Sequence, residues 1–304
     1  MMAGFNAPLL APNAQTVADI RVASDSRARP GGTANSAENT PADKTPFDVP
    51  TAKPAKDKDL ARVLSLHPEW RDTLDIIETT QEFDNQLLQL TEIRNPDLPE
   101  GPFYFVMHDD EHEAFDVMVW AVRTFGGLGI AIENNEQRLV DGGMDINREF
   151  GRASRPDLNY FFRTHIENGE QVIALHNNQD HPGGTMHLNN PAYFTKTCDA
   201  GDDVDDILII GDIGGDPNKF CGREQVADLV AKGLNVGWSR YGDRRSHAFD
   251  CEQRCNFQKF VVSYLGQTYF NLEAQRGKGS DKQKRQICAV LDPDKIRNAC
   301  ADPE

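Results

Sequence analysis

The sequence has no apolar run long enough to cross a bilayer as a helix, so we expect a protein without a membrane-spanning segment. Basic residues are also scarce. The chain has 32 Lys and Arg against 48 Asp and Glu, which gives a formal net charge of −16 and a pI near 4.9. A surface of this sign repels nucleic-acid phosphates and anionic membranes. These shortages exclude nucleic acid as an expected partner and favour basic or neutral substrates.

Cysteine is absent before Cys198, and all the cysteines lie in the last third of the chain. The six are Cys198, Cys221, Cys251, Cys255, Cys288 and Cys300. An even number of cysteines in a polar, loop-rich region favours two or three disulfides and an oxidising compartment. The spacing of Cys251 and Cys255 also fits half of a metal site, and free thiols are the third interpretation. We therefore expect a secreted or periplasmic protein, with the cytoplasm as the alternative.

A secretory signal is lacking as well, because residues 1–5 show no charged segment followed by an apolar one; the signal of an exported protein would have been removed or replaced. Residues 1–58 are rich in Ala, Pro, Ser, Asn, Thr, Asp and Lys, and cannot bury enough apolar surface to offset the entropy lost on ordering. We predict a disordered leader or linker over 1–58 and a single domain over 59–304. Apolar residues recur at helical spacing from Leu60 to Leu90, which predicts an N-terminal helical segment, residues 59–98, packed on that domain.

Strand-like and helix-like segments alternate along the rest of the chain. Short apolar runs with β-branched and aromatic residues predict strands, and apolar residues at helical spacing predict helices. The expected strands are Phe103–Met107, Ile130–Ile132, Val172–Leu175, Ile207–Ile210 and Asn235–Trp238, with a closing hairpin of Phe260–Leu265 and Thr268–Ala274. The expected helices begin near Glu113 and span Arg155–Asn168 and Glu224–Lys232. This alternation predicts an α/β fold with a mixed, partly parallel sheet flanked by helices.

Two histidines and a glutamate are the candidate metal ligands. His108 and Glu111 lie three positions apart after the first of these strands, where a tight turn can aim an imidazole and a carboxylate at one cation. His176 follows the third strand, and sites in open α/β sheets gather beyond the carboxyl ends of the strands. One histidine at a strand end is usually structural, but two of them, one with a glutamate partner, favour a site. His181 and His187, in a predicted loop over 180–206, are alternative ligands.

Two further positions predict chemistry. Glu273 stands between two apolar residues in the last predicted strand, and a carboxylate in such surroundings either pairs with a cation or has the raised proton affinity of a general base. The alternative for Glu273 is an ion pair with Arg276. The loop over 141–150 carries two glycines, and its Arg148 offers a planar fork suited to a carboxylate. The alternative for this loop is a surface turn with a local ion pair.

The order of these motifs resembles the zinc metallocarboxypeptidase family, the carboxypeptidase A-like clan that includes succinylglutamate desuccinylases and aspartoacylases. Those families have a His-x-x-Glu after an early strand, an Asp-x-Asn-Arg-x-Phe loop, a strand-end His and a late Glu. The matching stretches here are His108 to Glu111, Asp145 to Phe150, Leu175 to Asn177, and Asn271 to Glu273. Four matches in one order are fairly specific, whereas any one of them would be weak.

The resemblance implies a zinc carboxypeptidase-like sandwich with one bound zinc ion. It implies that the zinc ligands are His108, Glu111 and His176, and that the general base is Glu273. Asn147 and Arg148 resemble the pair that binds the carboxylate of the substrate. Arg138 lies near the position of a second arginine, which stabilises the oxyanion in that family.

The expected function is zinc-dependent hydrolysis of an amide or peptide bond next to a free carboxylate, as in a metallocarboxypeptidase. One alternative is an N-acyl amino acid deacylase of the succinylglutamate desuccinylase or aspartoacylase type. Another is a metal-free binding protein on the same scaffold, which the intact ligands and base argue against. The expected partner is thus a peptide or an N-acyl amino acid substrate.

Overall fold

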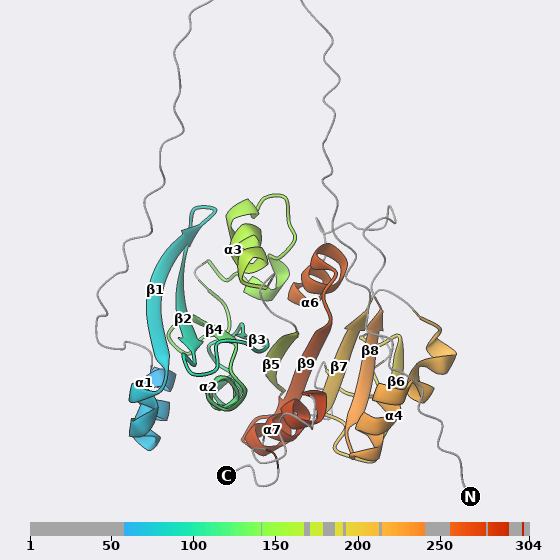
Figure 1. The fold of residues 1–304 in the computed structure, drawn as a ribbon. Helices are drawn as coiled ribbons and strands as arrows, with labels where there is room; N and C mark the ends of the chain where they lie inside the picture. Colours follow the sequence, from blue (N-terminus) through green and yellow to red (C-terminus); the bar gives the residue numbers. More distant parts are fainter. Residues whose placement is uncertain are drawn as a thin grey trace, which may run out of the picture. The chain divides into compact units, whose positions relative to one another are not determined.

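A nine-stranded sheet forms the centre of the computed structural model, which describes residues 58–140, 142–166, 171–178, 186–190, 193–212, 215–240, 256–277, 279–291 and 300. The strand order is β1-β2-β4-β3-β5-β9-β7-β8-β6 (Figure 1). The strands are β1 (Asp75–Phe83), β2 (Gln86–Arg94), β3 (Phe103–Val106), β4 (Leu128–Glu133), β5 (Val172–Asn178), β6 (Lys196–Cys198), β7 (Ile207–Asp212), β8 (Asn235–Arg240) and β9 (Tyr269–Gln275). The pairs β3/β4, β3/β5, β5/β9 and β7/β8 are parallel and the others antiparallel. The predicted mixed, partly parallel α/β fold is confirmed.

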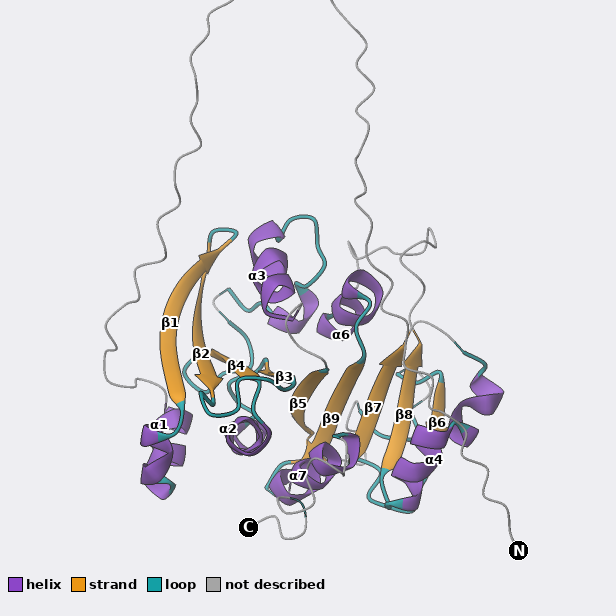
Figure 2. Ribbon diagram, in the orientation of Figure 1, coloured by secondary structure: helices purple, strands orange, loops and turns teal. Residues whose placement is uncertain are grey.

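Helices cover both faces of the sheet (Figure 2). One face packs against α1 (Lys58–Leu66), η1 (Pro68–Asp72), α2 (His112–Phe125), α4 (Glu224–Ala231) and α7 (Gly279–Val290). The other packs against α3 (Pro156–Ile166), α6 (Phe257–Lys259) and η4 (Phe260–Leu265); η2 (Ile146–Arg148) and η3 (Pro217–Gly222) are short turns between strands and helices. Each face has its own large cluster of buried apolar side chains, so the central strands are covered on both sides. Among these described helices, none combines the length and apolarity that crossing a bilayer would require.

The central strands follow directly from their apolar runs. All four residues of β3 are buried, as are the first six of β5, which is typical of parallel strands covered on both faces. Two glycines follow the end of α2: Gly126 and Gly127 have φ of 78° and 85°, and a Cβ on either would lie about 2 Å from a backbone oxygen. The chain therefore turns sharply into β4. The parallel register brings the carboxyl ends of β3, β4, β5 and β9 to one edge of the sheet.

The predicted N-terminal helical segment is correct over α1 and η1 and wrong over the β1–β2 hairpin that follows. Residues 75–94 form the β1–β2 hairpin, with Asp75 opposite Arg94 and Phe83 opposite Gln86. Asp84 and Asn85 make the two-residue turn with φ of 52° and 66°, the left-handed conformation that such hairpin turns need. The leucines that suggested a helix lie on β2, where burial alternates only partly. The two turn residues therefore determine the structure of this segment, in spite of the apparent helical spacing of its leucines.

The first strand of the predicted closing hairpin is also wrong, because residues 257–265 are helical as α6 and η4. Asn256 caps this segment by accepting a hydrogen bond from the Lys259 amide, and Gly266, in the left-handed conformation, ends it. A short, mostly apolar run of this kind fits a strand and a buried helix equally well, so flanking cap residues decide. The second predicted strand is present as β9.

The described cysteines form two disulfides, Cys198–Cys221 and Cys288–Cys300. The first joins β6 to η3, and the second ties α7 to a residue near the end of the chain. Cys251 and Cys255 lie outside the described residues. The prediction of two or three disulfides is consistent with these pairs, whereas a secreted or periplasmic location stays a prediction.

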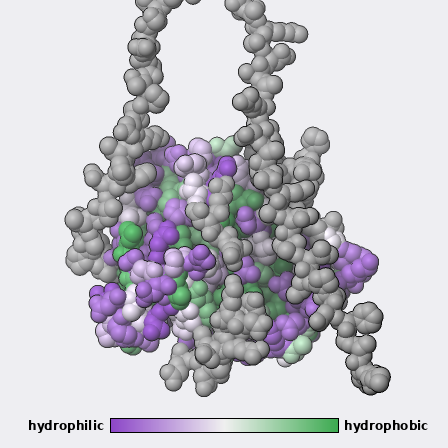
Figure 3. Space-filling view, in the orientation of Figure 1, coloured by the Kyte–Doolittle hydropathy of each residue, from purple (hydrophilic) through white to green (hydrophobic). Residues whose placement is uncertain are grey.

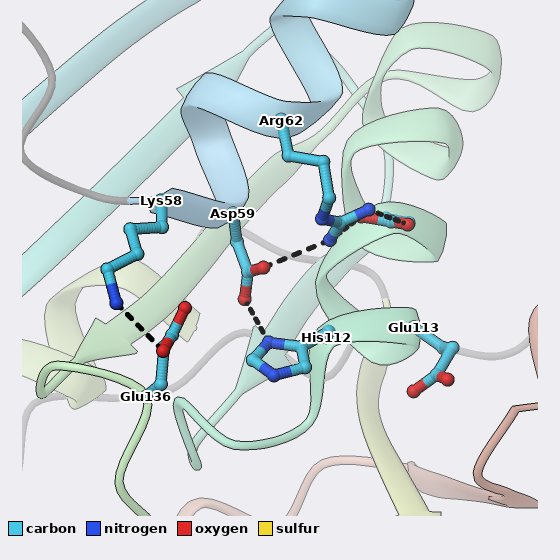
Figure 4. A pocket seen from close by; sticks show the side chains of 7 residues that line it. Lys58, Asp59, Arg62, His112, Glu113 and Glu136 are labelled. Carbon is cyan, nitrogen blue, oxygen red and sulfur yellow. Dashed lines mark hydrogen bonds and ion pairs between the residues drawn. The ribbon is translucent and has the colours of Figure 1, made fainter.

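Helix α1 is attached to α2 by charged side chains (Figure 4). The Asp59 carboxylate lies 2.8 Å from Nδ1 of His112 and 3.0 Å from the Arg62 guanidinium. Arg62 also contacts both carboxylate oxygens of Asp116 at 2.6 Å. In the space-filling view, hydrophilic side chains predominate over this end of the sheet (Figure 3). Polar contacts therefore supplement the apolar side of α1 in holding it on the domain.

Candidate metal centre and active site

Three ligand-type side chains from distant parts of the chain converge beyond the ends of β3 and β5. Nδ1 of His108 lies 3.0 Å from Oε1 of Glu111, and Nδ1 of His176 lies 2.9 Å from Oε2 of the same carboxylate. One ligand atom of each residue lies within 4.8 Å of the others, and all three residues are buried. The structure thus brings the three predicted ligands together. His187 is not part of this group, and His181 lies outside the described residues.

The turn between β3 and α2 presents two of these side chains. Glu111 is the N-cap residue of α2, and its amide donates to the carbonyl of His108 at 3.2 Å, which closes the turn. Asn177, the neighbour of His176, accepts a hydrogen bond through Oδ1 from the amide of Ala114 in the first turn of α2. A buried asparagine therefore ties the strand that carries His176 to the helix that begins at Glu111.

Helix α7 supports the same site from the opposite face of the sheet. The fully buried Gln283 donates through Nε2 to the carbonyls of His176 and Leu272, at 2.7 and 3.2 Å. Gln286, one turn later, donates to the carbonyl of Glu273 at 3.4 Å. Because β5 and β9 are adjacent, these two side chains fix the backbones of His176 and Glu273 relative to each other.

Charge is strongly coupled within this buried group. Burial alone would raise the pKa of Glu111, but the nearby imidazoles of His176 and His108 outweigh it and hold that pKa well below its ordinary value. Burial would lower the pKa of His108, yet its hydrogen bonds to Asp145 and Glu111 raise it to about 9. The metal-free site therefore holds an ionised glutamate against a protonated His108 at neutral pH.

Asp145 holds the other ring nitrogen of His108. Its Oδ1 lies 3.2 Å from Nε2 of His108 and also accepts a hydrogen bond from the Asn147 amide at 3.0 Å. Burial raises the pKa of Asp145, but the hydrogen bond and charge of His108, with the charge of Arg148, bring it to about 2. A carboxylate on Nε2 fixes the imidazole tautomer, so that Nδ1, the atom facing Glu111, can carry a lone pair for a metal.

Glu273 lies on β9, directly opposite His176 of β5, and only 5% of it is exposed. Burial raises the pKa of its carboxyl, although the charge of His176 and a hydrogen bond from Asn271 act in the other direction. Arg276, the partner considered for Glu273 from the sequence, instead pairs with Asp110. The ion-pair interpretation of Glu273 is therefore wrong.

The three predicted substrate-side residues lie in the connection between β4 and α3, two of them in η2. Arg138 donates from Nη1 to Oε1 of Glu111 at 3.0 Å, and nearly half of its side chain is exposed. Asn147 accepts through Oδ1 from the amide of Phe257 at 3.1 Å, so its carbonyl end joins this loop to α6. Arg148 is exposed, and its charge acts on Asp145. Arg138 therefore contacts a candidate ligand directly. Asn147 and Arg148 instead interact with Asp145, which in turn contacts His108.

Several solved structures are similar to this chain. The sequence matches no protein-family profile and no curated protein. A succinylglutamate desuccinylase/aspartoacylase from Rhodobacter sphaeroides is 16% identical, with a TM-score of 0.39 over 72% of this chain and 64% of its own. A metallo-carboxypeptidase from Pseudomonas aeruginosa is 14% identical, with a TM-score of 0.39 over 76% and 68%. An aspartoacylase family protein from Mesorhizobium loti is 14% identical, with a TM-score of 0.38 over 71% and 67%.

These are the families that the sequence motifs resemble. The chain spans less than two thirds of the length of the Rhodobacter protein, 64%, and somewhat more of the other two. Identities of this size concern the fold alone.

Sequence reasoning missed four supporting side chains. Asp145 belongs to one of the sequence motifs, but its contact with His108 depends on how two loops meet, which the motif does not encode. Asn271 could have been found, since it precedes Glu273 by two positions on a predicted strand and must share its face. Asn177 was noted only as part of a motif. Gln283 had no sequence signal, because α7 was not predicted.

Proposed function

We propose that this chain is a zinc-dependent hydrolase that cleaves an amide or peptide bond next to a free carboxylate. The observation that supports it most is the convergence of His108, Glu111 and His176, whose ligand atoms lie within 4.8 Å of one another in the buried end of the site. Two imidazoles and one carboxylate form the donor set of many catalytic zinc sites, which leave a fourth position open. The register of β5 and β9 adds a buried carboxylate, Glu273, beside this group.

The residues fit a zinc ion in the nature and orientation of their donors. Both histidines turn Nδ1 toward the same carboxylate, and Nε2 of His108 is already held by Asp145. A bound zinc would polarise the scissile carbonyl and lower the pKa of a water molecule. In this proposal His108, Glu111 and His176 hold that ion.

The other residues then have separate tasks in hydrolysis. Glu273 takes one proton from the attacking water, whose oxygen bonds to the acyl carbon, and delivers the proton to the nitrogen of the amine that leaves. Arg138 has guanidinium nitrogens beyond the one that contacts Glu111, and these stabilise the negative charge that develops on the carbonyl oxygen. Arg148, exposed on the neighbouring loop, binds the free carboxylate of the substrate together with the amide nitrogen of Asn147.

Metal analysis of purified protein tests the ligand set. We expect about one zinc per chain in the wild type and a large loss in His176→Ala. His187→Ala, which removes an imidazole outside the ligand group, is the matched control and should keep its zinc. A wild-type protein that binds no zinc when offered it would overturn the proposal and favour a metal-free binding protein.

Activity measurements separate the substrate classes. N-blocked dipeptides report carboxypeptidase action, whereas N-acetylaspartate and N-succinylglutamate report deacylase action. Glu273→Gln should retain zinc and lose roughly 10²- to 10⁴-fold in kcat on whichever class is cleaved. Cleavage of the acyl amino acids alone would replace the peptidase with the deacylase alternative, while full activity of Glu273→Gln would refute the assignment of the base.

A further inference from the structure

We propose that Asn271 is a positioning residue for Glu273, holding one oxygen of that carboxylate so that the other faces the substrate. The inference rests on the proposed function, because it takes Glu273 as the general base. Nδ2 of Asn271 donates to Oε1 of Glu273 at 2.9 Å. The two residues are two positions apart on β9, so their side chains leave the same face of the sheet.

A buried glutamate needs such a partner to act in one orientation. The terminal torsion of a glutamate side chain is broad, with no sharp preference of its own. Glu273 is 5% exposed, so water does not surround its carboxylate and fix its plane. A hydrogen bond from an uncharged donor to a charged acceptor in such surroundings is strong. Oε1 is therefore occupied by Asn271, and Oε2 is the oxygen left to accept a proton.

Asn271 is itself well placed to act as a fixed support. Its backbone lies in the middle of β9 and is paired on both sides, with Ala174 of β5 and with Ile209 of β7. Side chains on central strands are held more accurately than side chains on loops. Asn271 is 6% exposed, and among the described residues nothing donates to its Oδ1. Among the described residues, the Asn271 side chain therefore makes its hydrogen bond to Glu273.

A double-mutant cycle distinguishes positioning from a general structural role. The proteins are the wild type, Asn271→Ala, Glu273→Gln and the double variant, each loaded with zinc and assayed on N-benzoylglycyl-phenylalanine and on N-acetylaspartate. We expect Asn271→Ala to lose roughly 10- to 100-fold in kcat, as loss of an orienting partner does, with KM and zinc content nearly unchanged. In the Glu273→Gln background the same change should cost less than about twofold, because its effect passes through Glu273.

Two controls keep the outcome clear. Asn271→Asp keeps the shape of the side chain but replaces the donor with a second carboxylate, and should lose at least as much kcat as Asn271→Ala. Asn235→Ala truncates another buried strand asparagine, which bonds the Ala200 amide and the Asp203 carbonyl instead of Glu273. It should lower stability and leave kcat unchanged. Equal losses from Asn271→Ala in both backgrounds, or no loss in either, would overturn the inference.

Crystal structures provide a readout that does not depend on activity. In the zinc-loaded wild type we expect one orientation of the Glu273 carboxylate, and in Asn271→Ala more than one. If Glu273→Gln proves fully active, the proposed base is wrong, but these structures still decide whether Asn271 holds the side chain. A single unchanged orientation in Asn271→Ala would refute it.

Discussion

Replacing Asp145 with asparagine should weaken zinc binding without removing a ligand. The variant keeps the size of the side chain and its capping oxygen but loses the charge that faces Nε2 of His108. The pKa of Asp145, brought from an ordinary 3.8 to about 2 chiefly by His108 against the effect of burial, corresponds to about 2 kcal/mol of interaction between the charged partners. An energy of that size is close to the roughly 10- to 100-fold loss of metal affinity typical of removing such a carboxylate.

The chain supplies a matched control for this variant. Asp216 caps η3 by accepting a hydrogen bond from the Asn218 amide at 3.0 Å, as Asp145 caps η2 through the Asn147 amide at 3.0 Å. Among the residues that the structure describes, no histidine contacts Asp216. Asp216→Asn therefore makes the same chemical change at the same kind of cap, and zinc affinity should stay at the wild-type value.

Competition with a chromogenic chelator at pH 7 measures the zinc affinity of these proteins. We expect Asp145→Asn to bind zinc 10- to 100-fold more weakly than the wild type and than Asp216→Asn. An affinity within about twofold of the wild type would refute the reasoning. A carboxylate that interacts with His108 by about 2 kcal/mol should also change the affinity of His108 for a zinc ion.

Three further outcomes are expected. Because the pKa of His108 is about 9 in the metal-free protein and zinc binds neutral imidazole, binding at pH 7 should release about one proton and strengthen up to about pH 9; calorimetry in two buffers would show no buffer-dependent enthalpy if this is wrong. Arg62→Met should lower the free energy of unfolding by about 1 kcal/mol, while Lys58→Met, which removes an exposed pair, should leave it nearly unchanged; equal effects in chemical denaturation would contradict this. Replacing Cys198 and Cys221 by alanine, which opens a loop with a sequence separation of 23, should cost about 3 kcal/mol in the same assay, and an unchanged midpoint would count against it.

The sequence predicts best the strands that are buried on both faces of the sheet. The runs that became β3, β5 and β7 are apolar throughout, because helices cover both sides of these strands. The β1–β2 hairpin failed for the opposite reason. Its burial is partial and irregular, so the leucines of β2 fall by chance at helical spacing.

The residues of the candidate site also fall into those that the sequence predicts and those that it does not. The three ligand candidates and Glu273 were found because each follows or lies in a buried strand, and parallel strands bring their carboxyl ends to one edge. The contact of Asp145 with His108 joins residues 37 positions apart through a loop, and no periodicity in the sequence encodes it. Gln283 acts on carbonyls of two strands from the far face of the sheet, which requires knowing that α7 exists and where it packs.

The candidate centre is held in shape by contacts that do not involve a metal. The N-cap turn of α2 is fastened to β5 through Asn177, and the backbones of β5 and β9 are joined by Gln283. The loop that carries Asp145 is fastened to α6 through Asn147 and the Phe257 amide. Small zinc domains differ, because in them the ion itself supplies the energy of folding. Here a nine-stranded sheet with two large buried clusters supplies that energy, so an ion bound at the proposed centre would not be needed to assemble the site.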